Sequence, residues 1–150
     1  MGCPGPAGVV VIDTSAIVAM VFREPERAAI AQAIQQADKV LISTVSVLEA
    51  RMVVHGRRGQ RAVVLVDDLL RLPMFEIVAP GVAESDAAYA AVVAFGEGSG
   101  HPAGLNFGDV FSYALAKVRG LPLLYKGDDF ARTDLNCALA MMGEGGSVPV

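Results

Sequence analysis

The sequence predicts an α/β protein, a three-layer α/β/α sandwich with a mainly parallel sheet of four to five strands. Short apolar runs alternate along the chain with segments whose apolar residues recur every three or four positions. Such an alternation of strands and helices is typical of a parallel sheet that carries helices on both faces. Because the 150 residues contain no internal repeat and no linker, a single main domain is expected.

Four short strands are expected along the chain. At residues 9–12 four β-branched side chains follow one another, as in strands that are buried on both faces of a parallel sheet. Similar apolar runs predict further strands at residues 40–42, 75–78 and 122–125. Residues 135–139 could form a last short strand or a short helix.

Helices are predicted between these strands. Thr14 and Ser15 can cap a first helix, and Pro25 suits the first turn of a second one. Apolar residues at helical spacing predict the remaining helices, which follow the second strand, cover residues 62–69 and 86–95, and end at Gly120. The glycine-rich segment 96–104 is expected to be a loop.

Acidic residues follow the strands of this predicted sheet. Asp13 comes directly after the first strand, and Glu49 comes after the second. Asp109 lies in the first turn of the last helix, and Asp128 or Asp129 follows the fourth strand. Because parallel strands end at the same edge, these carboxylates are expected to converge where open α/β folds place their sites.

A cluster of four carboxylates requires a cation or a shared proton. Two carboxylates 4 Å apart repel each other by roughly 4 kcal/mol at an effective dielectric constant near 20. Oxygen ligands without nearby Cys or His favour Mg²⁺, with Mn²⁺ as a second possibility. Such ions acidify a bound water molecule and stabilise an in-line displacement at phosphorus. The sequence therefore predicts a divalent-metal site.

Each of these acids also has a purely structural interpretation. Asp13 could serve only as the cap of the first helix. Glu49 could complete a capping box with Ser46, whereas a cap at Thr44 would leave it free to face the site. Asp109 could simply interact with the helix macrodipole.

Three basic side chains are candidates for substrate contact. Arg51 and Arg58 belong to a basic run at the end of the third predicted helix, and guanidinium groups match the geometry of phosphate. His101 lies in the glycine-rich loop. The structural alternatives are a solvated helix face and an exposed histidine.

Composition excludes several other classes of protein. The net charge of −4 and the pI near 5.1 argue against binding nucleic acid through overall charge. Cys3 and Cys137 lack the spacing of a zinc site or a disulfide framework, which suits the cytoplasm. The longest apolar runs are too short for a membrane span despite a mean hydropathy of +0.49, and the first residues lack the pattern of a secretion signal.

Four stretches resemble the PIN-domain ribonucleases, and in particular the VapC toxins of bacterial toxin–antitoxin pairs. They are DTSA at residues 13–16, STVSVLEAR at 43–51, GLNFGDVFSYALAK at 104–117 and LLYKGDDFARTD at 123–134. The resemblance implies a PIN-like domain at residues 9–139, between a flexible extension at 1–8 and a flexible tail at 140–150.

This resemblance also implies roles for individual residues. It assigns metal binding to Asp13, Glu49 and Asp109, with Asp128 or its neighbour Asp129 as the fourth acid. Thr14 and Ser15 match the polar pair beside the first acid, which could orient water or phosphate. The family further implies an RNA substrate cut to 5′-phosphate and 3′-hydroxyl ends, a homodimer, and a cognate antitoxin protein that inserts near the acids.

The leading hypothesis is a Mg²⁺-dependent endoribonuclease that acts as a toxin. Two alternatives come from other classes. One is a phosphatase or receiver-like domain, although no acid follows the third predicted strand, where a receiver carries its phosphoacceptor. The other is a non-catalytic module that acts through a protein partner and whose acids are only helix caps.

Overall fold

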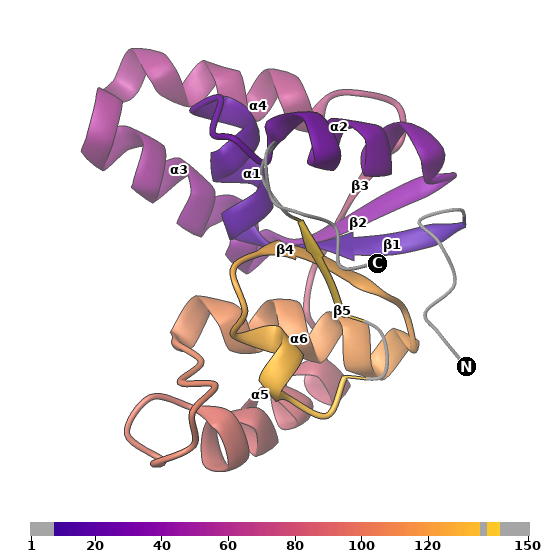
Figure 1. Cartoon of the computed structure of the whole chain (residues 1–150), viewed down its shortest axis with the longest axis vertical. Coiled ribbons are helices and arrows are strands. Elements are labelled where there is room, and N and C mark those ends of the chain that lie inside the picture. Colours follow the sequence, from indigo (N-terminus) through magenta and orange to yellow (C-terminus); the bar gives the residue numbers. More distant parts are fainter. Residues whose placement is uncertain (1–7, 136–137, 142–150) are drawn as a thin grey trace.

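The computed structural model describes residues 8–135 and 138–141. Figure 1 shows a sheet between two layers of helices. In chain order the elements are β1 (Val9–Ile12), α1 (Thr14–Val21), α2 (Arg27–Gln36), β2 (Lys39–Ser43), α3 (Thr44–Arg58), α4 (Val63–Leu70), β3 (Phe75–Val78), α5 (Val82–Phe95), α6 (Phe107–Arg119), β4 (Leu123–Lys126) and β5 (Ala138–Met141), with 3₁₀ turns at Gln60–Ala62 and Phe130–Arg132.

The five strands are parallel and lie in the order β3-β2-β1-β4-β5. The predicted fold class is therefore confirmed. The segment expected to be a strand or a helix near residue 135 forms β5, which continues to Met141 and so enters the expected tail. The rest of that tail, and the expected extension except Gly8, lie outside the described residues.

The central strand β1 faces a different helical layer with each successive side chain. Val10 and Ile12 pack with residues of α1, α2, α3 and α4, whereas Val11 packs with residues of α5 and α6. All three side chains are fully buried. This burial on both faces explains why β1 consists of β-branched residues without polar alternation. In Figure 1 the two helical layers lie above and below the sheet.

Helix α5 differs from its predicted extent. It begins at Val82 rather than near residue 86, because Glu84 accepts a hydrogen bond from the Gly81 amide (3.0 Å) and so closes the first turn. Helix α3 runs through Gly56 and ends at Arg58, within the predicted basic run, and its C-cap Gly59 has a positive φ of 82° that suits a glycine. Within the described residues, the helices are too short or too polar to cross a bilayer.

Candidate active site

Asp13 lies at the junction of β1 and α1 with a side chain that is 2% exposed. Its Oδ2 accepts a hydrogen bond from the Ser15 amide (3.0 Å), so Asp13 is the N-cap of α1. Its Oδ1 accepts a second hydrogen bond from the Ser112 hydroxyl of α6 (2.5 Å). Asp13 therefore caps its helix as the structural interpretation expects, but it is also tied to a residue 99 positions away.

Glu49 lies in the second turn of α3. The N-cap of this helix is Ser43, whose hydroxyl accepts a hydrogen bond from the Val45 amide (3.2 Å). Neither Ser46 nor Thr44 is the cap, because β2 ends at Ser43 and α3 begins at Thr44, so that the cap lies one residue before Thr44 and three residues before Ser46. Burial raises the pKa of Glu49, the Thr14 hydroxyl lowers it, and the charge of Asp13 raises it. Glu49 is thus free of the expected capping box and close to Asp13.

Asp109 occupies the first turn of α6 and forms a capping box with Asn106. Asp109 Oδ2 accepts a hydrogen bond from the Asn106 amide (3.0 Å), and Asn106 Oδ1 accepts one from the Asp109 amide (2.9 Å). The pKa of Asp109 is raised to about 7, mainly by burial and also by the charges of Asp13, Glu49 and Asp129, against the opposing effect of the Asn106 amide. The pKa of Asp109 therefore depends on the charges of Asp13, Glu49 and Asp129.

Asp128 and Asp129, the two candidates for the fourth acid, have different surroundings although both are exposed. Asp128 pairs with Arg132, whose Nη2 lies 2.9 Å from its Oδ2. Asp129 has its pKa raised by burial, and the charges of Asp128 and Asp13 act in the same direction against Arg132. The Asp129 carboxylate is thus electrostatically coupled to Asp13 and Asp109.

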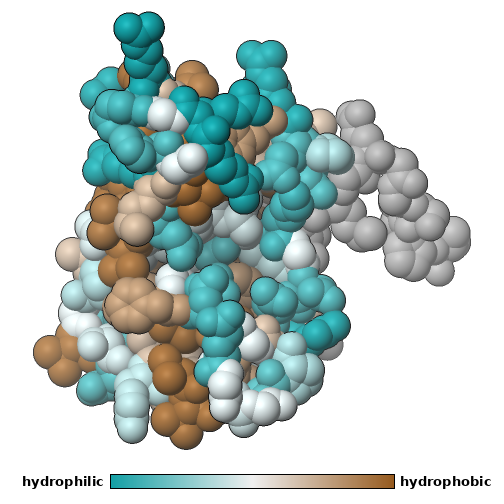
Figure 2. Space-filling view, turned by 90° about the vertical axis from the view of Figure 1, so that its left-hand side faces the viewer, coloured by the Kyte–Doolittle hydropathy of each residue, from teal (hydrophilic) through white to brown (hydrophobic). Residues whose placement is uncertain are grey.

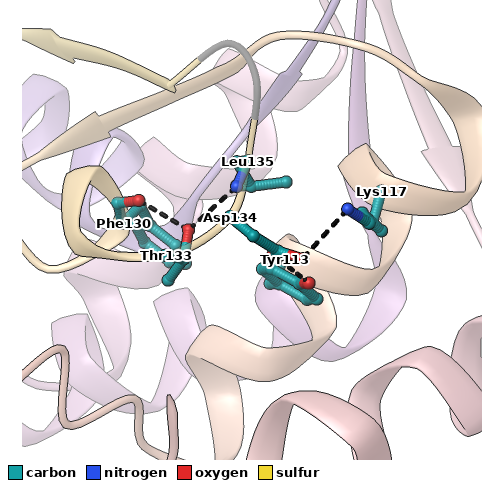
Figure 3. Close-up of polar contacts among 6 residues, drawn as sticks. All are labelled: Tyr113, Lys117, Phe130, Thr133, Asp134 and Leu135. Carbon is teal, nitrogen blue, oxygen red and sulfur yellow. Dashed lines mark hydrogen bonds and ion pairs between the residues drawn. The ribbon is translucent and has the colours of Figure 1, made fainter. Parts of the chain in front are cut away.

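The loop that carries these two residues is fastened to α6 by Asp134. Tyr113 donates a hydrogen bond to Asp134 Oδ1 (2.5 Å), and Lys117 donates one to Oδ2 (3.1 Å). These contacts lower the pKa of Asp134, with the Tyr113 hydrogen bond as the largest cause. Figure 3 shows both contacts, together with the Thr133 hydroxyl that donates to the carbonyl oxygen of Phe130 (2.6 Å). The loop after β4 therefore has a defined position beside the helix that bears Asp109.

Three of the predicted acids line one cavity of about 320 Å³, which we call the acid cavity. Its lining residues are Asp13, Thr14, Ser15, Val18, Glu24, Glu49, Val53, Arg57, Asn106, Asp109 and Lys126. In the described part of the chain, no three Asp, Glu, His or Cys side chains already form a set that could hold a metal ion. Asp13, Glu49 and Asp109 thus line one cavity, but their carboxylates are not yet close enough together to coordinate one ion.

The donor chemistry of the acid cavity fits a hard divalent cation. Its acids offer only oxygen ligands, as Mg²⁺ and Mn²⁺ prefer. Burial is the largest cause of the raised pKa values of Glu49 and Asp109, and neighbouring negative charge raises them further, with no positive charge among the causes to oppose it. Lys126, the ammonium group of the cavity, is already paired with Glu24 and lies 3.6 Å from Glu26. A cation between Asp13, Glu49 and Asp109 would supply this missing charge.

Of the five predicted substrate contacts, only Thr14 and Ser15 lie at the acid cavity. Thr14 and Ser15 line the acid cavity, where the Thr14 hydroxyl donates to the Ser46 carbonyl oxygen (3.2 Å) and Ser15 Oγ accepts from the Lys126 amide (3.0 Å). Arg51 instead pairs with Asp67 of α4 (2.8 Å).

The other two predicted contacts also lie outside the lining of the acid cavity. The Arg58 guanidinium lies over the Phe22 ring, 5.3 Å from its centroid. His101 accepts a hydrogen bond from the Ala103 amide (3.1 Å) and packs edge-on against Phe95, which gives it a role in shaping the loop.

Sequence reasoning missed several polar residues of the site, among them Arg57, Lys126 and Ser112. Arg57 lies eight residues after Glu49, and Lys126 directly follows the apolar part of the fourth strand. Ser112 lies three residues after Asp109, on the same side of α6. Helical spacing from a predicted acid could have identified Arg57 and Ser112, and the position at the end of the fourth strand could have identified Lys126.

Comparisons with known proteins agree with this geometry. The family model of the PIN domain matches residues 10–136. The chain belongs to the PIN-domain family. Among its relatives, Ribonuclease VapC30 of Mycobacterium tuberculosis is 44% identical over 125 residues, which are 83% of this chain and 95% of the relative. Ribonuclease VapC28 of the same species is 43% identical over 129 residues, which are 86% and 97%. This PIN-domain protein is therefore a member of the VapC group.

Solved structures of similar proteins share the fold. The VapBC2 complex of Rickettsia felis, bound to a DNA fragment from its promoter, matches with a TM-score of 0.70 at 13% identity, over 89% of this chain and 99% of the other. VapC20 of Mycobacterium tuberculosis, a toxin that cleaves the sarcin–ricin loop, matches with a TM-score of 0.66 at 18% identity, over 81% and 92%. These similarities extend over nearly the whole PIN domain.

Proposed function

We propose that this VapC-group protein is a Mg²⁺-dependent endoribonuclease that acts as the toxin of a toxin–antitoxin pair. The observation that carries the proposal is that Asp13, Glu49 and Asp109, from three separate parts of the chain, line one cavity. Its relatives are named ribonucleases, which supports RNA as the substrate class. The proposed reaction is hydrolysis of a phosphodiester to 5′-phosphate and 3′-hydroxyl ends.

In this proposal the three acids hold the metal ion, and Asp129 is the fourth acid. Bound Mg²⁺ would supply positive charge at the phosphate and acidify the attacking water molecule. Asp13 is oriented by the Ser15 amide and the Ser112 hydroxyl. Arg57 lies on α3 at the same cavity and is the proposed contact to a substrate phosphate. Because the net charge is −4, such local contacts must hold the RNA.

Replacement of single acids tests the proposal. Asp13→Asn and Asp109→Asn keep the size of the side chain and an oxygen that can accept the capping hydrogen bond. Cleavage of RNA with Mg²⁺ present is expected to fall at least about 100-fold in both variants, which is the scale of losing an electrostatic group of the transition state. Asp68→Asn, on the exposed side of α4, is the matched control and should cleave like the parent. Activity of Asp13→Asn within a few-fold of the parent would end the proposal.

A cognate antitoxin is the proposed protein partner. Several similar structures are toxin–antitoxin complexes, including one from Klebsiella pneumoniae. On this chain, a groove between α1 and α4 has an apolar floor of Met20, Val21, Leu65 and Leu69, with Arg23 and Arg27 beside it. The groove suits an amphipathic segment with acidic residues. Co-purification of the chain with the product of its neighbouring gene, and inhibition of cleavage by that product, test this partner.

We expect the protein to act in the cytoplasm, where RNA is found.

A homodimer is also proposed. Several large apolar side chains are exposed on helices that contact one another: Leu48 and Met52 on α3, Phe107 on α6, and Tyr89 and Val93 on α5. Figure 2 shows apolar side chains gathered along one side of the molecule beneath a hydrophilic upper part. Light scattering should give the mass of a dimer, and Met52→Asp should lower it to that of a monomer.

A further inference from the structure

A chain of buried hydroxyl groups lies behind the carboxylate of Asp13. Ser112 Oγ lies 2.5 Å from Asp13 Oδ1, and Ser46 Oγ lies 3.1 Å from Ser112 Oγ. The side chain of Thr14 donates to the carbonyl oxygen of Ser46 (3.2 Å). Ser46 is 0% exposed and Ser112 is 1% exposed. The hydroxyl groups of Ser46 and Ser112 are therefore beyond the reach of substrate, and solvent cannot replace them.

The direction of the hydrogen bonds in this chain follows from the groups themselves. A carboxylate oxygen only accepts, so the single proton of Ser112 is donated to Asp13. Ser112 must then act as the acceptor toward Ser46, which donates its own proton. A hydrogen bond from a hydroxyl to a carboxylate is short and strong, as the 2.5 Å distance reflects. One orientation of the Asp13 carboxylate is thus favoured over others.

The sequence positions of Ser46 and Ser112 link these buried hydrogen bonds to the acids of the cavity. Ser46 precedes Glu49 by three residues in α3, and Ser112 follows Asp109 by three residues in α6. Residues three apart lie on the same side of a helix. The Ser46–Ser112 contact therefore joins the two helices that carry Glu49 and Asp109, and Ser112 also bonds to Asp13, which lines the same cavity as these acids.

We propose that Ser112 is a positioning residue that fixes the Asp13 carboxylate for metal binding, and that Ser46 fixes Ser112 in turn. The inference rests on the proposed metal-dependent function and deepens it. Neither serine lines the acid cavity, so both act through Asp13. Hydrogen-bond partners of metal ligands commonly contribute 10- to 100-fold to metal affinity, about the size of effect expected for Ser112.

The experiment measures thermal unfolding at increasing Mg²⁺ concentration. Ser112→Ala is expected to need about 10- to 100-fold more Mg²⁺ than the parent for the same rise in melting temperature. Ser46→Ala, which acts one step further away, is expected to show a smaller change in the same direction. At saturating Mg²⁺, kcat for RNA cleavage should return to within a few-fold of the parent, because the acids themselves are unchanged.

Ser43→Ala is the matched control. Ser43 is also a buried serine (3% exposed) next to α3, but its hydroxyl caps that helix. Its loss should lower the melting temperature without changing the Mg²⁺ requirement. Ser112→Cys, which keeps the volume of the buried side chain and is a weak donor, replaces Ser112→Ala if the alanine variant does not fold.

The outcomes separate this inference from the proposed function. A parent protein that Mg²⁺ stabilises, together with a Ser112→Ala variant whose Mg²⁺ requirement equals that of Ser43→Ala, would overturn the inference alone. A parent protein that Mg²⁺ neither stabilises nor activates would overturn the proposed function and the inference with it.

Discussion

The carboxylate of Glu49 fills the space that a side chain at Gly108 would need. A Cβ atom built on Gly108 would lie 1.8 Å from Glu49 Oε2 and 2.4 Å from Glu49 Cδ. Gly108 is in the first turn of α6, next to Asp109, so the absence of a side chain there lets two acids from different helices approach each other.

Gly108→Ala is expected to remove activity while leaving the fold intact. The flexible end of Glu49 can move away from the new methyl group, so the backbone need not shift. The displaced carboxylate should lower kcat/KM for RNA cleavage at least about tenfold, because small misplacements at a site have large effects on rate. Assays of cleavage and circular dichroism measure the two effects.

Gly56→Ala is the control for this substitution. Gly56 also lies in a helix, but nothing lies within 4 Å of a Cβ at this position. Alanine is expected to stabilise α3 by about 0.5–1 kcal/mol and to leave cleavage unchanged. Equal activity in the two variants would contradict the role that we assign to the space at Gly108.

Asp109→Asn is expected to change the pH dependence of stability when Mg²⁺ is removed with EDTA. The folded protein holds the pKa of Asp109 at about 7, above its ordinary value of 3.8. Between these values the native state binds more protons than the unfolded state, so Asp109 lowers stability as pH rises through this window. Asparagine cannot ionise, and it can still cap with Asn106.

The melting temperature of Asp109→Asn should therefore exceed that of the parent at about pH 8 and match it near pH 4. After allowance for solvent screening, the gain at the higher pH is about 1–2 kcal/mol, or roughly 3–6 °C for a domain of this size. Differential scanning calorimetry across this range measures it. A difference that does not vary with pH would contradict the raised pKa.

Asp129→Asn and Asp128→Asn are expected to differ in cleavage. Asp129 interacts electrostatically with Asp13 and Asp109, whereas Asp128 is paired with Arg132, and both side chains are exposed. Initial rates with Mg²⁺ should fall at least about tenfold for Asp129→Asn, as for loss of a charged group near the reacting phosphate. Asp128→Asn should remain within about threefold, because exposed ion pairs contribute little. The reverse order of rates would make Asp128 the fourth acid.

Arg57→Gln and Arg51→Gln are expected to separate substrate binding from structure. Arg57 lines the acid cavity, whereas Arg51 pairs with Asp67. Loss of one phosphate contact should raise KM for Arg57→Gln and reduce the slope of log KM against log salt concentration by about 0.7 for a single strand, with kcat little changed. Arg51→Gln should keep the salt dependence of the parent. A reduced slope in Arg51→Gln instead would move the proposed RNA contact to the other side of α3.

The fold was largely predictable because hydrophobic burial determines it locally. The β-branched run of β1 and the helical spacing in α6 each specify their element, and β1 is central because both of its faces are buried. The cap of α3 was not predictable, because Ser43, Thr44 and Ser46 can all cap a helix. Ser43 is the cap because β2 ends at this residue and α3 begins at the next one.

The acids were predictable from their positions after strands, but their partners depend on tertiary structure. Asp128 and Asp129 are adjacent in the sequence, and only their tertiary partners differ, since Asp128 pairs with Arg132 and Asp129 is coupled to Asp13. Arg57 could have been selected over Arg51 and Arg58 by helical phase, since Glu49, Val53 and Arg57 are four residues apart and all line the acid cavity. The Ser112–Asp13 hydrogen bond joins residues 99 positions apart, and the sequence alone offers no measure of that distance.

The strand order has a consequence for the chain while it is being synthesised. Within this chain β1 precedes the other strands yet lies in the middle of the finished sheet, and its neighbour β4 is made only after β2 and β3. Asp13 therefore meets Ser112 only after 99 further residues have been added to the chain. A chain that stops between β3 and Leu123 would pair β1 with β2 alone, and we expect it not to assemble the acid cavity.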